Sequence, residues 1–136
     1  MAKKRKVNIN KLVDVPVEYD LKKYAKKIMD LKGIQAGLFD FNFIGAKRML
    51  SINKEYLNHN YVTDIITFNL ADEGQDIIAD IYICVDQARE QGHSLDEEIK
   101  LLMVHGILHL LGYDDQTDID KAIMDKEQLV LLERAG

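Results

Sequence analysis

The sequence predicts an α+β fold in which a mixed β-sheet is packed with about five helices. Three observations lead to this prediction. Segments with the period of a strand alternate with segments of helical period in the order β-α-β-α-β-β, and further helices follow. Residues 77–85 are almost continuously apolar, which is typical of a strand inside a sheet. Residues 95–111 have helical length, and Ser94 with Glu97 forms a capping-box signal at their start.

The first part of the chain supplies an edge strand and an amphipathic helix. Val7 and Ile9 alternate with asparagines, which is the period of a short edge strand. Asp14 and Pro16 mark the start of a helix that Gly33 ends. This helix has one apolar face and, opposite it, a face rich in lysine.

The middle of the chain supplies three further strands and a second helix. Residues 39–43 place phenylalanine at every second position, which predicts a strand. Residues 46–57 return to helical period, and residues 58–62 are expected to form a loop. Strands follow at 65–70 and 77–85, and we expect the second of these to be central in the sheet.

The last third of the chain is predicted to be helical. Residues 86–92 form a short helix and residues 95–111 a long one. His93, between them, is expected to face the solvent. Thr117 caps a final helix that runs to about Glu133.

Composition indicates one ordinary globular domain over residues 1–136. Of its 136 residues, 47% are hydrophobic and 30% charged, which allows a core of its own. No apolar run approaches the roughly 18 residues that cross a bilayer, so we expect neither a membrane span nor a signal peptide. The single Cys84 cannot form an internal disulfide, which fits a reducing cytoplasm, and its apolar neighbours predict a buried thiol.

The net charge of −5 hides an asymmetry between the two parts of the chain. Residues 1–56 hold 13 Lys and Arg against 6 Asp and Glu, a balance of +7. Residues 57–136 hold 5 against 17, a balance of −12. A basic half could contact phosphates while an acidic half surrounds a cation. Solvated helix faces of different sign would give the same counts, so both interpretations stay open.

A candidate metal site lies between Val104 and Asp115. His105 and His109 are four residues apart in the long predicted helix, so both imidazoles leave the same helix face. Gly112 stands where a helix is most easily stopped, and Asp115 follows at a spacing that lets its carboxylate return to the histidines. Two imidazoles and one carboxylate form the ligand set of an open, catalytic metal site.

The spacing of these residues is that of the extended metzincin-type zinc signature, which predicts a metzincin-like metal helix. Gly106 departs from this signature, because a zinc protease carries its glutamate general base at that position. Hydrolysis of a phosphodiester depends less on a carboxylate base than hydrolysis of a peptide does. Gly106 therefore favours a nuclease over a protease.

Three parts of the sequence resemble the YbeY family of bacterial endoribonucleases, which are metal-dependent, act on single strands and take part in the maturation of ribosomal RNA. The family's signature H-G-x-L-H-L-x-G-Y-D-H is matched by HGILHLLGYDD. Its block N-x-x-Y-R-x-K-D-x-x-T-D-V-L-S-F is matched by NKEYLNHNYVTDIITF, residues 53–68, and its G-D-I strand by Asp80 and Ile81. The resemblance implies a four-stranded sheet with a metal cleft beside its antiparallel edge.

The resemblance also implies the function and the cofactor. His105, His109 and Asp115 would be the catalytic metal ligands, with Asp115 in place of the family's usual third histidine. Zinc, one ion per chain, accepts this set, and the carboxylate also admits Mn, Fe or Ni. The implied enzyme is a single-strand-specific endoribonuclease of the cytoplasm, acting in maturation of the 3′ end of small-subunit ribosomal RNA and in ribosome quality control. Its partners would be single-stranded RNA, ribosomal RNA and the small ribosomal subunit, while the oligomeric state stays open.

Four further residues are candidates for the site. His59 falls at a lysine position of the family's block, Asp64 completes its T-D pair, and Asp80 lies on its strand, so we expect these three to bind substrate. Asp114 is a candidate for a residue that contacts the metal ligands or transfers a proton near them. Leu57 stands where the family has an arginine suited to a phosphate. Each candidate could instead be a loop, cap, strand or turn residue without a role in catalysis.

Two other classes of function remain open. A metzincin-like metallopeptidase would need a general base, and the expected position holds Gly106. A non-catalytic protein that binds RNA or the ribosome around a structural metal would need a fourth protein ligand, and the sequence offers three.

Overall fold

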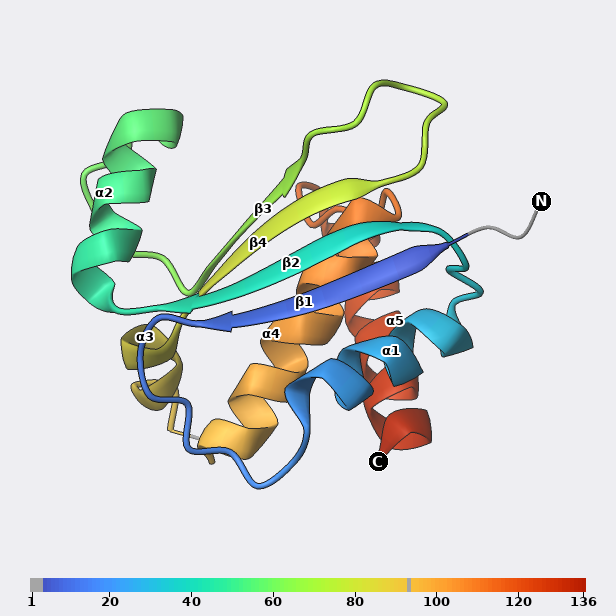
Figure 1. The fold of residues 1–136 in the computed structure, drawn as a ribbon, viewed down its shortest axis with the longest axis horizontal. Helices are drawn as coiled ribbons and strands as arrows, with labels where there is room; N and C mark the ends of the chain where they lie inside the picture. The colour runs from blue at the N-terminus through green and yellow to red at the C-terminus, as the bar shows by residue number, and fades with distance from the viewer. Residues whose placement is uncertain (1–3, 93) are drawn as a thin grey trace.

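The computed structural model describes residues 4–92 and 94–136, so His93 lies outside the described residues. Within these ranges the chain forms four strands and five helices (Figure 1). The strands are β1 (Arg5–Lys11), β2 (Gly37–Ile44), β3 (Ile65–Asn69) and β4 (Ile78–Cys84). The helices are α1 (Leu21–Leu31), α2 (Ala46–Leu57), α3 (Val85–Arg89), α4 (Leu95–Leu110) and α5 (Asp118–Ala135).

The sheet is mixed, with the strand order β1-β2-β4-β3. Strands β1, β2 and β4 run parallel, and β3 runs antiparallel to β4. The predicted edge strand, β1, does lie at an edge, and the almost continuously apolar strand, β4, lies between two neighbours. The predicted α+β fold with a mixed sheet is therefore confirmed.

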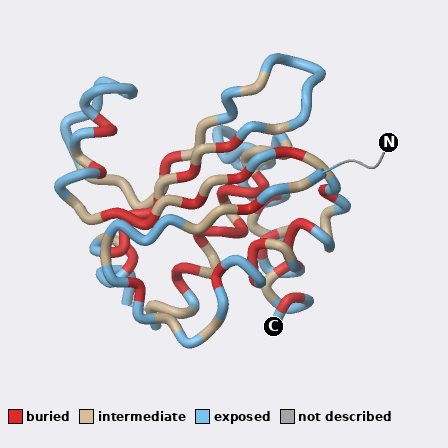
Figure 2. The backbone as a smooth tube through the Cα atoms, viewed as in Figure 1, coloured by how far each residue is buried: buried red, intermediate tan, exposed pale blue. Residues whose placement is uncertain are grey.

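One face of the sheet is covered by α1 and α4, and α5 packs against these two helices (Figure 1). Strand side chains alternate between faces, which turns Phe39, Phe41 and Phe43 toward these helices together with Ile81 and Ile83. All five are fully buried. Figure 2 shows the buried backbone gathered along the central strands and on the sides of the helices that meet them.

Helix α2 packs against the opposite face, at one end of the sheet (Figure 1). Met49 and Ile52 of α2 form a second, smaller apolar cluster with Ile66 and Cys84. The predicted burial of Cys84 is confirmed, and this burial raises the pKa of its thiol. Among the described residues, the rest of this face is not covered by a helix, and it mixes polar side chains such as Asp40 and Asp80 with exposed apolar ones such as Leu38 and Ile78.

The predicted start of the first helix is wrong. Asp14 and Pro16 lie in irregular chain, and α1 begins at Leu21. Asp20 is the actual cap, since its side chain accepts a hydrogen bond from the Lys23 backbone N–H at 3.0 Å. Val15 is buried in the core, 5% exposed, and its burial keeps the segment before α1 extended.

The ends of the metal helix follow the prediction. Ser94 caps α4 by accepting a hydrogen bond from the Glu97 N–H at 3.1 Å, and Thr117 caps α5 in the same way. Gly112 stops α4 in the left-handed region, at φ +97°, where its N–H bonds to the His109 carbonyl at 3.0 Å. None of the described helices has both the length and the apolarity of a membrane span.

Candidate active site

Helix α4 brings His105 and His109 to the same point. One turn separates them, and their rings lie 4.5 Å apart, centre to centre, at an angle of 79°. Both residues are only partly exposed, with side-chain exposures of 25% and 30%. The helix is buried on its other sides, so these two imidazoles form the part of its last turns that opens to solvent.

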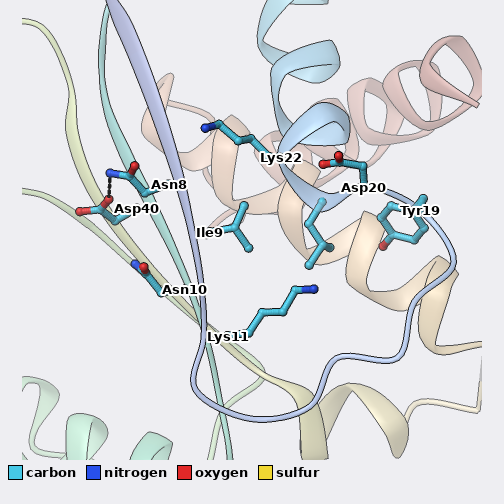
Figure 3. Close-up of a pocket in the computed structure, with 9 residues that line it drawn as sticks. Asn8, Ile9, Asn10, Lys11, Tyr19, Asp20, Lys22 and Asp40 are labelled. Carbon is cyan, nitrogen blue, oxygen red and sulfur yellow. Dashed lines mark hydrogen bonds between the residues drawn. The ribbon is translucent and has the colours of Figure 1, made fainter.

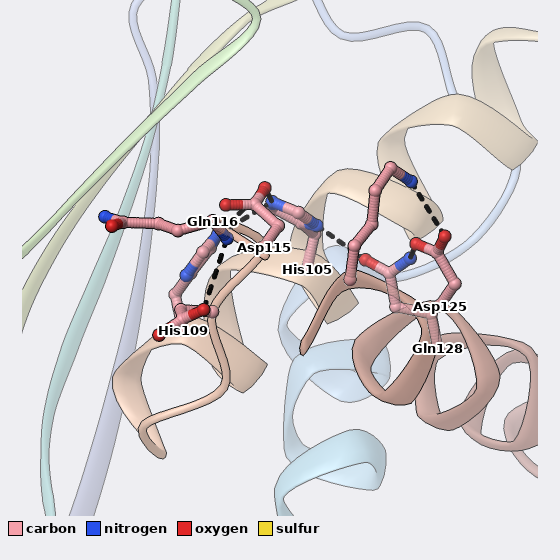
Figure 4. Close-up of polar contacts among 8 residues, drawn as sticks. His105, His109, Asp115, Gln116, Asp125 and Gln128 are labelled. Carbon is pink, nitrogen blue, oxygen red and sulfur yellow. Dashed lines mark hydrogen bonds and ion pairs between the residues drawn. The ribbon is translucent and has the colours of Figure 1, made fainter. Parts of the chain in front are cut away.

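Asp115 returns to the histidines through the turn that Gly112 permits. Its Oδ2 lies 4.0 Å from Nε2 of His105 and 4.0 Å from Nε2 of His109. The three ligand atoms all lie within 4.8 Å of one another, and Figure 4 shows the three side chains converging. The structure therefore brings together the residues that the sequence predicts as metal ligands.

Gln128 of α5 fixes the orientation of His105. Its Oε1 lies 2.6 Å from Nδ1 of His105, and its Nε2 donates to Oδ1 of Asp125 at 3.5 Å (Figure 4). Asp125 is held in turn by Lys121, 2.7 Å away. A carbonyl oxygen only accepts, so Nδ1 of His105 carries the proton and Nε2 presents its lone pair to the cluster.

This donor set fits a divalent cation. The Nε2 atoms of His105 and His109 lie 2.9 Å apart, where two lone pairs would repel each other unless a cation or a proton lay between them. The carboxylate of Asp115 adds a negative charge on the open side. Two imidazoles and one carboxylate, with one imidazole oriented by a neighbouring amide, are the arrangement of catalytic metal sites.

The cluster opens into a cleft of about 730 Å³ beside strand β3. The cleft is lined by β3 itself, by Leu110 and Gly112 near the histidines, and by Asn53 and Leu57 of α2. Its remaining wall is the segment that joins α2 to β3. This position, at the antiparallel edge of the sheet, agrees with the expected metal cleft.

Gly106 lets α4 lie close to the sheet. It is buried, and a Cβ built on it would lie 3.0 Å from Cδ1 of Ile65 and 3.6 Å from Cγ2 of Ile81. The position therefore faces β3 and β4 rather than the ligands. A longer side chain here would have to displace the sheet.

Two of the candidate substrate-binding residues lie in the cleft. His59 and Asp64 both line it. Asp64 also borders a smaller cavity of about 130 Å³ next to His105 and Gln128. The neighbouring Thr63 closes the loop, because its Oγ1 accepts a hydrogen bond from Nδ2 of Asn53 at 3.1 Å.

The structure does not bring Asp80 or Asp114 to the cluster. Asp80 lies on the opposite face of the sheet, where it accepts hydrogen bonds from Asn42 at 2.8 Å and Tyr82 at 3.0 Å. Burial and this bond to Asp80 raise the pKa of Tyr82. Asp114 is exposed and accepts a hydrogen bond from the Gln116 N–H at 3.2 Å, as a turn residue does.

A second hollow, of about 720 Å³, lies around β1 at the opposite edge of the sheet (Figure 3). Its wall combines Lys11 and Lys22 with a hydrogen bond between Asn8 and Asp40 at 2.7 Å. Among the described residues that line it there is neither histidine nor cysteine. It therefore lacks the ligands of the cleft.

The basic residues of the first half do not gather in the cleft. The lysines of α1 lie on the helical side of the sheet, and Lys47, Arg48 and Lys54 lie on exposed positions of α2. Among the described residues that line the cleft there is neither lysine nor arginine.

Two residues of the site were not identified from the sequence. Gln128 comes from a helix whose packing on α4 the pattern does not reveal, although its place on the same helix face as Met124 and Leu131 is a signal. Tyr61 lines the cleft and stacks on His59. Its aromatic side chain in a polar loop is the signal that could have found it.

Comparison with known proteins places these features in a family. The sequence profile described as Endoribonuclease YbeY matches residues 6–136. The Endoribonuclease YbeY of Bacillus licheniformis is 35% identical over 131 residues, covering 82% of this chain and 83% of the relative. That of Staphylococcus carnosus is 38% identical over 106 residues, with 69% of each covered, and that of Acholeplasma laidlawii 42% identical over 98 residues, with 69% and 72% covered.

The fold also has a solved counterpart, the solution structure of TM1509 from Thermotoga maritima. It superposes with a TM-score of 0.60 at 22% sequence identity, covering 96% of this chain and 88% of that one. This similarity concerns the fold alone. The matched profile and the identities above show that the chain belongs to the endoribonuclease YbeY family.

Proposed function

We propose that this chain cleaves single-stranded RNA at the cluster of His105, His109 and Asp115, with one divalent cation held there. Family membership makes it a metal-dependent endoribonuclease, a hydrolase that acts in the processing of ribosomal RNA. The observation that carries the assignment of the site is the convergence of three ligand atoms within 4.8 Å at the mouth of the cleft.

Each residue of the cluster has a distinct task. His105 and His109 would hold the cation through Nε2, and Gln128 orients the His105 ring so that this nitrogen faces the cluster. Asp115 would complete the ligand set with its carboxylate and balance part of the charge of the cation. When bound, the cation supplies Lewis acidity, which polarises a phosphodiester oxygen and makes water a better nucleophile near neutral pH.

Zinc is the proposed cation, because it favours imidazole and carboxylate ligands in an open four-coordinate site. Mn, Fe and Ni also accept these donors. The remaining wall of the cleft positions the RNA. Asp64, which lines the same cavities as His105, would accept a hydrogen bond from a ribose hydroxyl, and His59, which lines the cleft, would contact the nucleotides.

The proposed physiological substrate is ribosomal RNA at the 3′ end of the small subunit, in the cytoplasm. Ribosomal RNA and the small ribosomal subunit would then be its partners, and ribosome quality control a further consequence. We propose one domain, residues 1–136, for this function, because α2 and α4, which both line the cleft, pack against the same sheet.

A metallopeptidase is not supported by the environment of Gly106. A glutamate base would have to start from a buried position that faces β3 and β4. A structural metal is equally unsupported, because the cluster holds three ligands among the described residues and opens into a cleft.

The proposal is tested by incubating the purified chain with single-stranded RNA, duplex RNA and a denatured protein. We expect internal cleavage of the single strand, loss of that cleavage with chelator and recovery on addition of zinc. His109→Ala is the matched variant and should be inactive in every condition. Cleavage that persists in chelator, or equal cleavage by His109→Ala, would refute the assigned site.

A further inference from the structure

Two aromatic rings form a flat, exposed surface in the wall of the cleft. The rings of His59 and Tyr61 stack with their centres 4.9 Å apart and only 14° between their planes. Tyr61 is 54% exposed, and His59 is exposed as well. Both residues line the same cleft as His105 and His109. A parallel pair of this kind leaves ring surface open to a third flat group.

The loop that carries the pair is held in place by Asn53. Its backbone carbonyl accepts hydrogen bonds from the N–H groups of Asn58 and His59, the latter at 3.0 Å, and its Nδ2 donates to Thr63 at 3.1 Å. Asn58 adopts the left-handed conformation, φ 55°, that turns the chain out of α2. The rings therefore sit on a segment fixed at both ends, which lowers the entropy lost on binding.

The chemistry of the cleft indicates which part of an RNA chain it can bind. Among the described residues that line it there is neither lysine nor arginine, so inside the cleft no cationic side chain attracts the phosphates. Leu57 adds apolar surface, 38% exposed. Asn53 also lines the cleft but is fully buried, so its side chain holds the loop rather than facing a ligand. Nucleobases offer the flat aromatic face that exposed rings and apolar surface can bind.

We propose that His59 and Tyr61 form a stacking site for one nucleobase of a single-stranded RNA bound at the metal cluster. The proposal rests on the proposed function and adds to it a reason for strand selectivity. In a duplex both faces of each base are covered by neighbouring bases, whereas an unpaired base can leave its stack and lie against an aromatic ring. The aromatic pair therefore favours RNA whose bases are unpaired, because only such a base can stack on it.

The absence of tryptophan from the sequence gives a direct test. Tyr61→Trp places the single indole of the chain in the cleft, and a base stacked on it quenches its fluorescence. The probe is a 2′-O-methyl oligoadenylate of about ten nucleotides, within the length that single-strand sites cover. It is titrated into the metal-loaded full chain. We expect saturable quenching by the single strand and none by the same oligonucleotide in a duplex.

Affinity measurements on matched variants complete the test. Tyr61→Ala should bind the oligonucleotide about tenfold more weakly, while Tyr61→Phe, which keeps the ring, should stay within about twofold of the parent chain. Tyr56→Ala is the control, because Tyr56 is 63% exposed but outside the cleft lining and contacts Phe68 edge to face. It should not change the affinity. Unchanged melting temperatures exclude unfolding as the cause.

The outcomes separate the two proposals. If the parent chain cleaves RNA but Tyr61→Ala binds it as tightly as the parent, or if the indole emission does not change at saturation, the stacking site is refuted and the proposed function stands. If the parent chain neither binds nor cleaves single-stranded RNA, the proposed function is refuted together with it.

Discussion

At the scale of single residues, the orientation of His105 depends on a hydrogen bond from its ring to a residue of another helix. His105 bonds to Gln128, which is only 8% exposed and whose amide is oriented by Asp125. A spacing rule finds His105 and His109 because both lie on one helix. It does not find Gln128, because that contact depends on how α5 packs against α4.

Gln128 supplies a first prediction. Gln128→Met keeps the volume of the side chain but removes the acceptor, so His105 loses the bond that fixes its tautomer. We expect zinc affinity to fall by roughly 10- to 100-fold, as is usual when the group behind a metal ligand is lost. Gln128→Glu retains an acceptor and should bind zinc at least as tightly as the parent chain. Calorimetric titration measures both, and equal affinity in Gln128→Met would refute the role.

Asp115 and Asp114 supply a second prediction. The spacing in the sequence favours Asp115, and the structure agrees, since Asp114 bonds to the Gln116 backbone instead. Asp115→His should keep the metal, because imidazole is a good ligand, and Asp115→Ala should weaken it by more than tenfold. Asp114→Ala is the control and should leave zinc affinity unchanged. Loss in Asp114→Ala with none in Asp115→Ala would mean that the wrong aspartate is assigned.

At the scale of elements, the strands and the metal helix could be predicted and the first helix start could not. Helix α4 has a strong cap at Ser94 and a glycine stop, so local signals agree with packing. The segment around Asp14 has local helix signals too. Burial of Val15 and a hydrogen bond from Tyr19 to the Asp96 carbonyl at 3.1 Å hold it extended, and these contacts are far apart in sequence.

The face on which Asp80 lies was predictable in principle. Ala79 and Ile81 face the helices, and strand side chains alternate, so Asp80 must face the other way. The almost continuous apolar run of β4 obscured this alternation. The prediction that Asp80 binds substrate came from its position in the motif, whereas the two-residue period indicates the face on which its side chain lies.

The contact between α4 and the sheet gives a third prediction. Gly106→Ala brings a Cβ to 3.0 Å from the flexible end of Ile65, a cost that the higher helix propensity of alanine, about 1 kcal/mol, largely offsets. Gly106→Glu must bury a larger, charged group against β3 and should lose at least ~3 kcal/mol of unfolding free energy. Urea denaturation compares the two. A fully stable Gly106→Glu, or one with peptidase activity, would contradict the packing described.

At the scale of the whole molecule, the charge asymmetry seen in the sequence does not produce a basic cleft. Exposed basic residues of α2, Lys47, Arg48 and Lys54, lie on the helix that contributes Asn53 and Leu57 to the cleft wall. The lysines of α1 lie on the other side of the sheet. Where charges gather depends on the arrangement of helices, which a count along the sequence does not contain.

This arrangement gives a fourth prediction. If α2 guides the RNA, replacing Lys47, Arg48 and Lys54 by glutamine should reduce the slope of log affinity against log salt by about 2, since each single-strand phosphate contact contributes about 0.7. Replacing Lys22, Lys23 and Lys27 of α1 is the matched control and should leave the slope unchanged. Fluorescence anisotropy at several salt concentrations measures it. An equal change of slope for the α2 and the α1 replacements would contradict a specific role of α2, because both replacements alter the net charge equally.

The central claim is that His105 and His109 together hold one cation. Its most direct test is the metal content of the purified chain, measured by mass spectrometry after equilibration with zinc and removal of the unbound ion. The parent chain should retain one ion per chain, and His105→Ala and His109→Ala should each retain far less than one, with melting curves that show both variants folded. Full retention of zinc in both variants would contradict the account.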